Sequence, residues 1–200
     1  MSVTATGAVT GTNGDGVYAL NAGTNLTIST ASVSGNSAGI YALNNGSGSL
    51  SVTSSGLVTG NTAQGIFAQN ESTGVNLGIT AAAVTGATDG IVARNLGTGT
   101  TSVTSTGTVT GTSGEGVHAR NSLGGTDLTI FTASVSGGAG GILADNDGTG
   151  ALSVTATGTV TGTTGDGFRA YNAGTNLTVN AASVSGGRYG IVAANGRSEE

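Results

Sequence analysis

The sequence has no cysteine, no proline and no tryptophan, and only 8% of its 200 residues are charged. Without cysteine it can form no disulfide, no thiolate metal site and no cysteine nucleophile. Its five cations are all arginines, they form no basic run, and the formal net charge is -5, so a nucleic-acid partner is not expected. No apolar run approaches the roughly 18 residues of a membrane span. Direct membrane insertion is therefore not expected, and no secretory signal opens the chain, so we expect any export signal to lie outside it.

Glycine is abundant instead, with 39 residues, and Val, Ile, Thr and Ser fill much of the rest. Disordered chains usually combine high net charge with few β-branched residues, which is the opposite of this composition. β-Branched residues favour strands, and glycine, serine and asparagine favour turns. The composition therefore predicts short strands separated by glycine-rich turns.

One motif recurs eight times: a Gly, an apolar residue, any residue, Ala, any residue, Asn. The copies begin at Gly16, Gly39, Gly65, Gly90, Gly116, Gly141, Gly167 and Gly190. Between successive copies lie an alternating stretch such as Leu26-Thr27-Ile28-Ser29 and a Val-Thr-Gly or Val-Ser-Gly stretch. Each unit thus offers three short strands, and a fixed period in this range is typical of a stacked architecture with one coil per repeat.

These repeats predict an all-β, right-handed, single-stranded parallel β-helix (β-solenoid) of about eight three-strand coils, each of ~25 residues. It should cover residues 1–195, followed by a short charged tail, 196–200. The step from the first strand to the second alternates in length: Val52 to Val58 is six residues and Ile79 to Val84 is five. The coils are therefore predicted to be arranged as two-coil repeats.

The repeated asparagine occupies an inward register beside aliphatic residues, and a buried amide must be hydrogen-bonded. Stacked at the coil spacing, each amide can bond its neighbour and the adjacent turn. We therefore predict a structural asparagine ladder made of Asn21, Asn44, Asn70, Asn95, Asn121, Asn146, Asn172 and Asn195.

Three outward faces remain. Two carry rows of hydroxyls, such as Thr27 and Ser29. The third face mixes aromatic, charged and aliphatic residues, and this variety makes it the predicted binding face. Its candidate residues are Tyr18, Tyr41, Phe67, Arg94, His118, Arg120, Arg169 and Tyr171, and we expect a cross-coil pair between Arg120 and Asp145.

The acid–base candidates are Asp89, Glu115 and His118. Asp89 and Glu115 precede the motif glycine in adjacent coils, so their backbones should lie about 4.8 Å apart. Two close carboxylates could share a proton or hold a cation, as in glycosidases. The variety of residues at this position indicates a permissive turn, so no catalytic residue is assigned; the other copies hold Asp15, Ala38, Gln64, Gly140, Asp166 and Tyr189. The Gly-Asp-Gly turn at Asp15 is similar to calcium-binding β-rolls, but those repeat every nine residues, and no metal or cofactor is expected.

The run LTISTASVSGNSAGIYALNNGSGS followed by LSVTSSGLVTGNTAQGIFAQN resembles the passenger regions of bacterial autotransporters of the pertactin and adhesin type. The resemblance implies a β-helix displayed outside a Gram-negative cell, at its surface. The expected function is a non-enzymatic stalk or adhesin segment with a host-surface partner or self-association as its interaction. The alternatives are a polysaccharide-active β-helix enzyme and an ice- or crystal-surface binder that uses the Thr and Ser rows. Open strand edges at the terminal coils also predict an end-to-end homo-oligomer.

Overall fold

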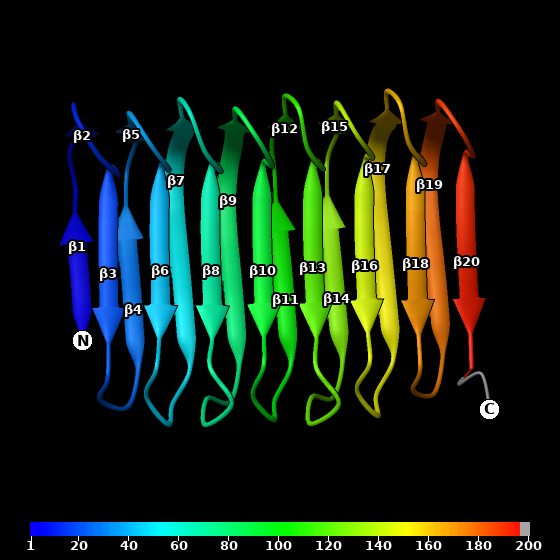
Figure 1. The fold of residues 1–200 in the computed structure, drawn as a ribbon, viewed down its shortest axis with the longest axis horizontal. Helices are drawn as coiled ribbons and strands as arrows, with labels where there is room; N and C mark the ends of the chain where they lie inside the picture. The colour runs from blue at the N-terminus through cyan, green and yellow to red at the C-terminus, as the bar shows by residue number, and fades with distance from the viewer. Residues whose placement is uncertain (197–200) are drawn as a thin grey trace.

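The computed structural model describes residues 1–196, and this part of the chain is built of twenty strands with no helix (Figure 1). The predicted charged tail lies outside the described residues except for Gly196. All strand pairings are parallel, and each joins one coil to the next. The predicted β-solenoid is confirmed.

The strands form two sheets. The eight-stranded sheet has one strand per coil, in the order β20-β18-β16-β13-β10-β8-β6-β3. Its strands are β3 (Val17–Asn21), β6 (Ile40–Asn44), β8 (Ile66–Asn70), β10 (Ile91–Asn95), β13 (Val117–Asn121), β16 (Ile142–Asn146), β18 (Phe168–Asn172) and β20 (Ile191–Asn195).

The remaining strands form the twelve-stranded sheet. They are β1 (Ser2–Ala5), β2 (Val9–Gly11), β4 (Leu26–Thr30), β5 (Val33–Gly35), β7 (Leu50–Gly60), β9 (Leu77–Gly86), β11 (Thr101–Ser105), β12 (Val109–Gly111), β14 (Leu128–Thr132), β15 (Val135–Gly137), β17 (Leu152–Gly162) and β19 (Leu177–Gly186).

The coil is right-handed. In Figure 1 the near strands, from β3 to β20, run downward, the more distant strands run upward, and the chain advances from the N-terminus at the left to the C-terminus at the right. The rod is thus a single body with its two ends at opposite extremes.

The number of strands per coil differs from the prediction in half of the coils. Three separate strands form in the first, second, fifth and sixth coils, but the first two strands join into one in β7, β9, β17 and β19. The alternating step survives as a local shift of register: between β7 and β9, Ser54 pairs with Ala81 and Leu57 pairs with Ala83. In this stretch β7 therefore has one residue more than β9, which is a β-bulge. The same shift recurs between β17 and β19.

The core is a stack of identical register positions, and Leu26, Ile28, Val33, Ile40 and Ala42 show one complete set, all buried. Each pairs in register with its equivalent in the next coil. Burying a side chain of this size contributes roughly 1.5–3 kcal/mol relative to exposure. The aliphatic residues beside the predicted asparagine ladder therefore point inward.

The motif glycine is required by close packing between coils and not by an unusual backbone conformation. A Cβ on Gly39 would lie 2.5 Å from Cγ1 of Val58 in the next coil and 2.6 Å from the carbonyl oxygen of Gly65. The only positive φ among the described residues belongs to Gly196. The motif therefore begins with glycine because no side chain fits where successive coils meet.

Candidate functional site

The outward side chains of the eight-stranded sheet form two parallel rows, which we call the outer face. One row begins with Tyr18, Tyr41 and Phe67, and the other begins with Leu20 and Leu43. All eight residues predicted for the binding face lie in these rows, because successive strands pair without a shift of register. These eight residues therefore share one face of the eight-stranded sheet.

Aromatic rings stack at the N-terminal end of the outer face. The ring centroids of Tyr18 and Tyr41 lie 5.3 Å apart, those of Tyr41 and Phe67 lie 4.9 Å apart, and both pairs are nearly parallel. The guanidinium carbon of Arg94 lies 5.9 Å from the centre of the Phe67 ring, within the range of a cation–π contact. Tyr18 is 62% exposed and Leu20 46% exposed. This end therefore presents an apolar surface to solvent.

Two residues of the outer face are nevertheless buried. Val92 is 1% exposed and Leu143 is 8% exposed. Val92 pairs in register with Phe67 on one side and His118 on the other. A shorter side chain between longer ones on neighbouring strands is covered by them, which is the physical reason for its burial.

The predicted ion pair between Arg120 and Asp145 is wrong. The Arg120 guanidinium instead bonds Asp147, with Nη2 2.7 Å and Nε 3.2 Å from Oδ2. Asp145 is the direct register partner of Arg120 on β16, but Asp147 lies two residues further, where the chain has left the strand. Burial raises the pKa of Asp145, opposed by the positive charge of Arg169. Both members of the observed pair are more than a third exposed, so its contribution to stability is small.

His118 is half-buried, and the charges near it are those of Arg94, Arg120, Asp89 and Asp145. Burial lowers its pKa, and the positive charge of Arg94 lowers it further, while the charge of Asp89 opposes the change. The neutral imidazole is therefore favoured. Residues 1–196 contain no group of three or more His, Asp or Glu side chains arranged to hold a metal ion.

Asp89 and Glu115 do not face one another as a pair of carboxylates. Oδ1 of Asp89 accepts a hydrogen bond from the backbone N–H of Glu115 at 2.8 Å, and the carboxylate of Glu115 accepts one from the N–H of Gly140. Asp15 does the same for Ala38, at 2.8 Å. Asp15, Asp89 and Glu115 thus each cap the next coil. Burial nevertheless raises the pKa of Glu115, and the Gly140 N–H opposes this change.

Three further caps were missed from the sequence. Asn25, Asn76 and Asp127 each accept a hydrogen bond through Oδ1 from a backbone N–H of the next coil, at 2.8, 2.9 and 2.7 Å. They precede the first strand of alternate coils, at a spacing of 51 residues, or two coils. The spacing of 51 residues could have identified these caps from the sequence, because it equals the two-coil repeat that the alternating step indicates.

The asparagine ladder is present, but it consists of two segments. Side-chain bonds of 2.6–2.8 Å join Asn21, Asn44 and Asn70 in one segment and Asn146, Asn172 and Asn195 in the other. Asn95 and Asn121 bond loop carbonyls instead, those of Val75 and Asp127 among them.

The interruption follows from loop length. The corners at 71–76 and 122–127 are the longest, and each brings a carbonyl, of Asn76 or Asp127, to the amide of the preceding ladder residue. Nδ2 of Asn121 donates to Asp127 and not to Asn146, and Oδ1 of Asn146 is buried without a hydrogen-bond partner among the described residues. The ladder is continuous only where the corner is short.

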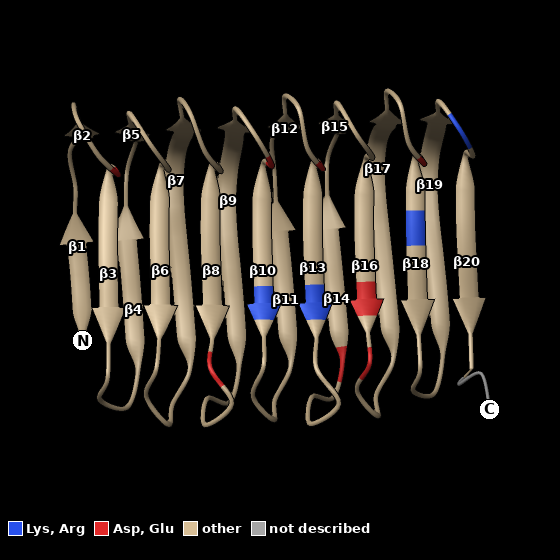
Figure 2. Ribbon diagram, in the orientation of Figure 1, with Lys and Arg blue, Asp and Glu red and all other residues tan. Residues whose placement is uncertain are grey.

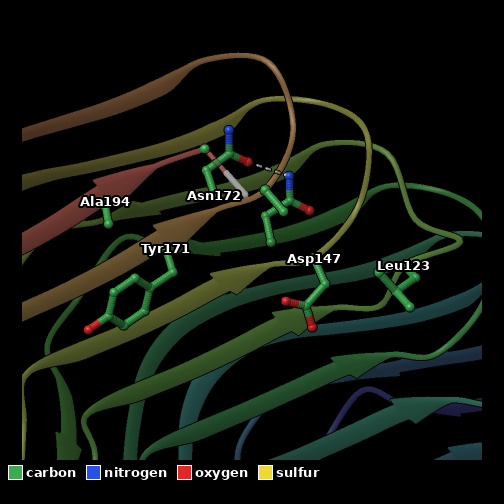
Figure 3. A pocket seen from close by; sticks show the side chains of 8 residues that line it. Leu123, Asp147, Tyr171, Asn172 and Ala194 are labelled. Carbon is green, nitrogen blue, oxygen red and sulfur yellow. Dashed lines mark hydrogen bonds between the residues drawn. The ribbon is translucent and has the colours of Figure 1, made fainter. Parts of the chain in front are cut away.

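Two hollows lie in the C-terminal half of the rod. The larger, about 410 Å³, is lined by Leu123, Asp147, Tyr171 and Ala194 together with ladder residues. Figure 3 shows Tyr171 on one side of Asp147 and Leu123 on the other, beneath the bond of 2.8 Å between Asn146 and Asn172. The smaller, about 210 Å³, includes Glu115, Asp166, Arg169 and Arg188 in its walls.

Comparison with known proteins gives no relative: no protein-family model matches the sequence, and no curated protein and no solved structure matches the chain. Among the described residues no helix is long and apolar enough to cross a bilayer. The fold therefore rests on the repeats and the strand register.

Proposed function

We propose that this chain is a non-enzymatic stalk or adhesin segment of a secreted or cell-surface bacterial protein, of the kind found in autotransporter passengers. The observation that carries the proposal is the unbroken register of the eight-stranded sheet, from β3 to β20, which fixes one constant inward set and one variable outward set. A stack of this kind keeps its outer face at a fixed orientation along its whole length.

The non-enzymatic assignment is supported by how the carboxylates are used. Asp89 and Glu115 both accept backbone hydrogen bonds from the following coil, which is a structural task. The ice-binding alternative is less well supported, because Phe131 interrupts the hydroxyl row and is 44% exposed there. Regular rows of hydroxyls are also what exposed strand positions favour in general.

The stalk role is tested by limited proteolysis together with small-angle scattering. Eight coils separated by about 4.8 Å give a rod whose stacking axis is roughly 35 Å long. We expect each protomer to have that length along the stacking axis and a core resistant to broad-specificity protease, because its backbone N–H and C=O groups are held in the two sheets. Rapid cleavage inside the strands would contradict the proposal.

The adhesin role is tested on beads coated with the protein and added to cultured epithelial cells. A variant with Tyr18→Ser and Tyr41→Ser changes the aromatic stack, and a matched control with Thr27→Ala and Ser51→Ala changes two exposed or half-exposed hydroxyls of the twelve-stranded sheet. We expect adhesion to fall only in the aromatic variant. Equal adhesion of both variants, or none by the unaltered protein, would oppose this role.

For the 200-residue chain itself we also propose end-to-end association. At one edge Val3 and Val9 are only partly buried, and at the other Ile191 is 52% exposed. Ladder polarity is compatible with stacking, since Nδ2 of each bonded asparagine donates toward the C-terminal end. Sedimentation over a range of concentrations should show oligomers that Ile191→Lys reduces, and a monomer at all concentrations would refute the idea.

A further inference from the structure

The sequence contains three Asn-Gly dipeptides, which begin at Asn13, Asn45 and Asn195. In such a pair the backbone nitrogen of the glycine can attack the side-chain amide of the asparagine, because glycine has no Cβ to obstruct the approach. The reaction needs an amide that can turn toward the main chain and a backbone nitrogen that is not held in a hydrogen bond. The three dipeptides differ in both respects.

Asn13 lies in the corner between β2 and β3 and meets both requirements. Its side chain is exposed and makes no hydrogen bond with any other residue of the described chain. Among residues 1–196 the N–H of Gly14 donates no hydrogen bond either, whereas the equivalent N–H of Gly165 donates to the carbonyl of Ala139 in the preceding coil at 2.8 Å. Gly14 belongs to the first coil of the described stack, where no preceding coil supplies an acceptor.

Asn45 is exposed as well, but the glycine that follows it is held. Gly46 is buried, and its N–H donates to Oδ1 of the ladder residue Asn44 at 3.3 Å. A Cβ on Gly46 would overlap the carbonyl oxygen of Gly23, so this turn is packed against the coil before it. The nitrogen that would attack is therefore fixed in the turn.

At Asn195 the side-chain amide itself is held. Its Oδ1 accepts from Nδ2 of Asn172 at 2.8 Å, and its Nδ2 donates to the carbonyl of Thr175 at 3.1 Å. The N–H of Gly196 also donates to the carbonyl of Asn172, at 2.9 Å. Both reacting groups must leave these bonds before they can meet, which slows the reaction.

We propose that Asn13 is a site of spontaneous deamidation in the folded protein, and that Asn45 and Asn195 are protected. The Gly14 nitrogen bonds to Cγ of Asn13, and the bond from Cγ to Nδ2 breaks. Ammonia leaves with the proton of the Gly14 N–H, which gives a cyclic imide. Water then opens the ring at either carbonyl and leaves aspartate or isoaspartate, so no oxidant or reductant is consumed. This modification does not depend on the stalk or adhesin role.

The reaction places a new negative charge in the first corner. Figure 2 shows an acidic residue just before β3, and the sequence identifies it as Asp15. Asp15 caps the second coil through the N–H of Ala38, at 2.8 Å. The product therefore carries two acidic groups beside this cap, and its formal net charge is more negative than the -5 of the unmodified chain. Anion-exchange chromatography separates the two forms.

The test is a time course on the intact chain at mildly alkaline pH, where the attacking nitrogen loses its proton more readily. The protein is kept dilute, because the end-to-end association proposed above would cover the first coil. Each sample is unfolded and digested with pepsin at acidic pH, where the reaction is slow, and mass spectrometry measures deamidation at the three asparagines. We expect Asn13 to be modified at least about tenfold faster than Asn45 or Asn195 in the folded protein, and the three rates to converge in denaturant.

Gly14→Ala is the variant that tests the mechanism. A Cβ there would meet nothing within 4 Å, and Ala63 already occupies the equivalent position of the third coil, so the fold accepts the change. Gly7→Ala, which also meets nothing within 4 Å, is the matched control in the same coil. We expect modification of Asn13 to be at least about fivefold slower in Gly14→Ala and unchanged in Gly7→Ala.

The rate at Asn45 in each variant shows whether the fold is intact, because unfolding would expose that dipeptide. Deamidation of Asn13 no faster than that of Asn45 or Asn195 in the folded protein would overturn the proposal. An unchanged rate at Asn13 in Gly14→Ala would overturn it as well.

Discussion

Asn44 gives the sharpest test of the ladder. Its side chain is fully buried and makes four hydrogen bonds. Oδ1 accepts from Nδ2 of Asn21 at 2.6 Å and from the N–H of Gly46 at 3.3 Å. Nδ2 donates to Oδ1 of Asn70 at 2.8 Å and to the carbonyl of Gly48 at 3.1 Å. Both donors and both acceptors of this amide are therefore satisfied.

Asn44→Ala should cost about 4 kcal/mol of unfolding free energy, because a net value of roughly 1 kcal/mol is lost for each of four bonds. The loss also leaves Oδ1 of Asn70 without its donor inside the rod. Exposed Asn45 is the matched control, and Asn45→Ala should change stability by less than about 0.5 kcal/mol.

The assay is guanidinium unfolding followed by circular dichroism, with hydrogen exchange of the second and third coils to detect local opening. We expect the midpoint to fall strongly for Asn44→Ala and the amides of these coils to exchange faster. If Asn44→Ala costs no more than Asn45→Ala, the ladder does not stabilise the stack and the reasoning is refuted.

Three further predictions concern packing, charge and pH. Gly39→Ala should prevent correct stacking, because its Cβ would lie 2.5 Å from a valine methyl of the next coil. Gly7→Ala should be tolerated, because a Cβ there would meet nothing within 4 Å. Thermal melts compare the midpoints of the two variants. Arg120→Ala should cost less than about 1 kcal/mol, and less still at high salt, because the pair with Asp147 is exposed; a double-mutant cycle with Asp147→Ala measures this. Because the folded-state pKa of His118 is lowered, its contribution to stability is present above the ordinary value of 6.5 and is lost as pH falls through the folded pKa. His118→Gln should remove that part of the pH dependence of the unfolding free energy. Identical pH profiles for the variant and the unaltered protein would contradict this prediction.

The strands, coil period and inward set could be predicted because packing allows little choice at those positions. Val33, Ile40 and Ala42 each pair with the equivalent residue of the next coil. Similar side chains are therefore needed at these positions in every coil, and the sequence shows them as a repeat. The alternating step likewise predicted the two-coil unit, and the structure explains it as the bulge before Leu57.

Contacts of long or loop-borne side chains could not be predicted, because period alone says which residues are neighbours and not which atoms meet. Arg120 has Asp145 as its register partner, yet it reaches Asp147 beyond the strand end. Asp89 lies one coil from Glu115, yet its carboxylate finds the backbone N–H and not the other acid. A buried or half-buried carboxylate gains more from a hydrogen bond than from a like charge.

The caps and the ladder stabilise the same joint from two corners. The carboxylates of Asp15 and Glu115 and the amides of the two ladder segments bind the next coil, so polar side chains as well as apolar ones join these coils to their neighbours. Where the long corner takes the Asn121 amide, the bond to Asn146 is lost, and the sixth coil is the one that also lacks a side chain at Gly140. The connection between the fifth and sixth coils therefore rests on the Glu115 cap without a bond from Asn121 to Asn146, whereas the connection between the sixth and seventh coils rests on the bond from Asn146 to Asn172 without a cap from Gly140.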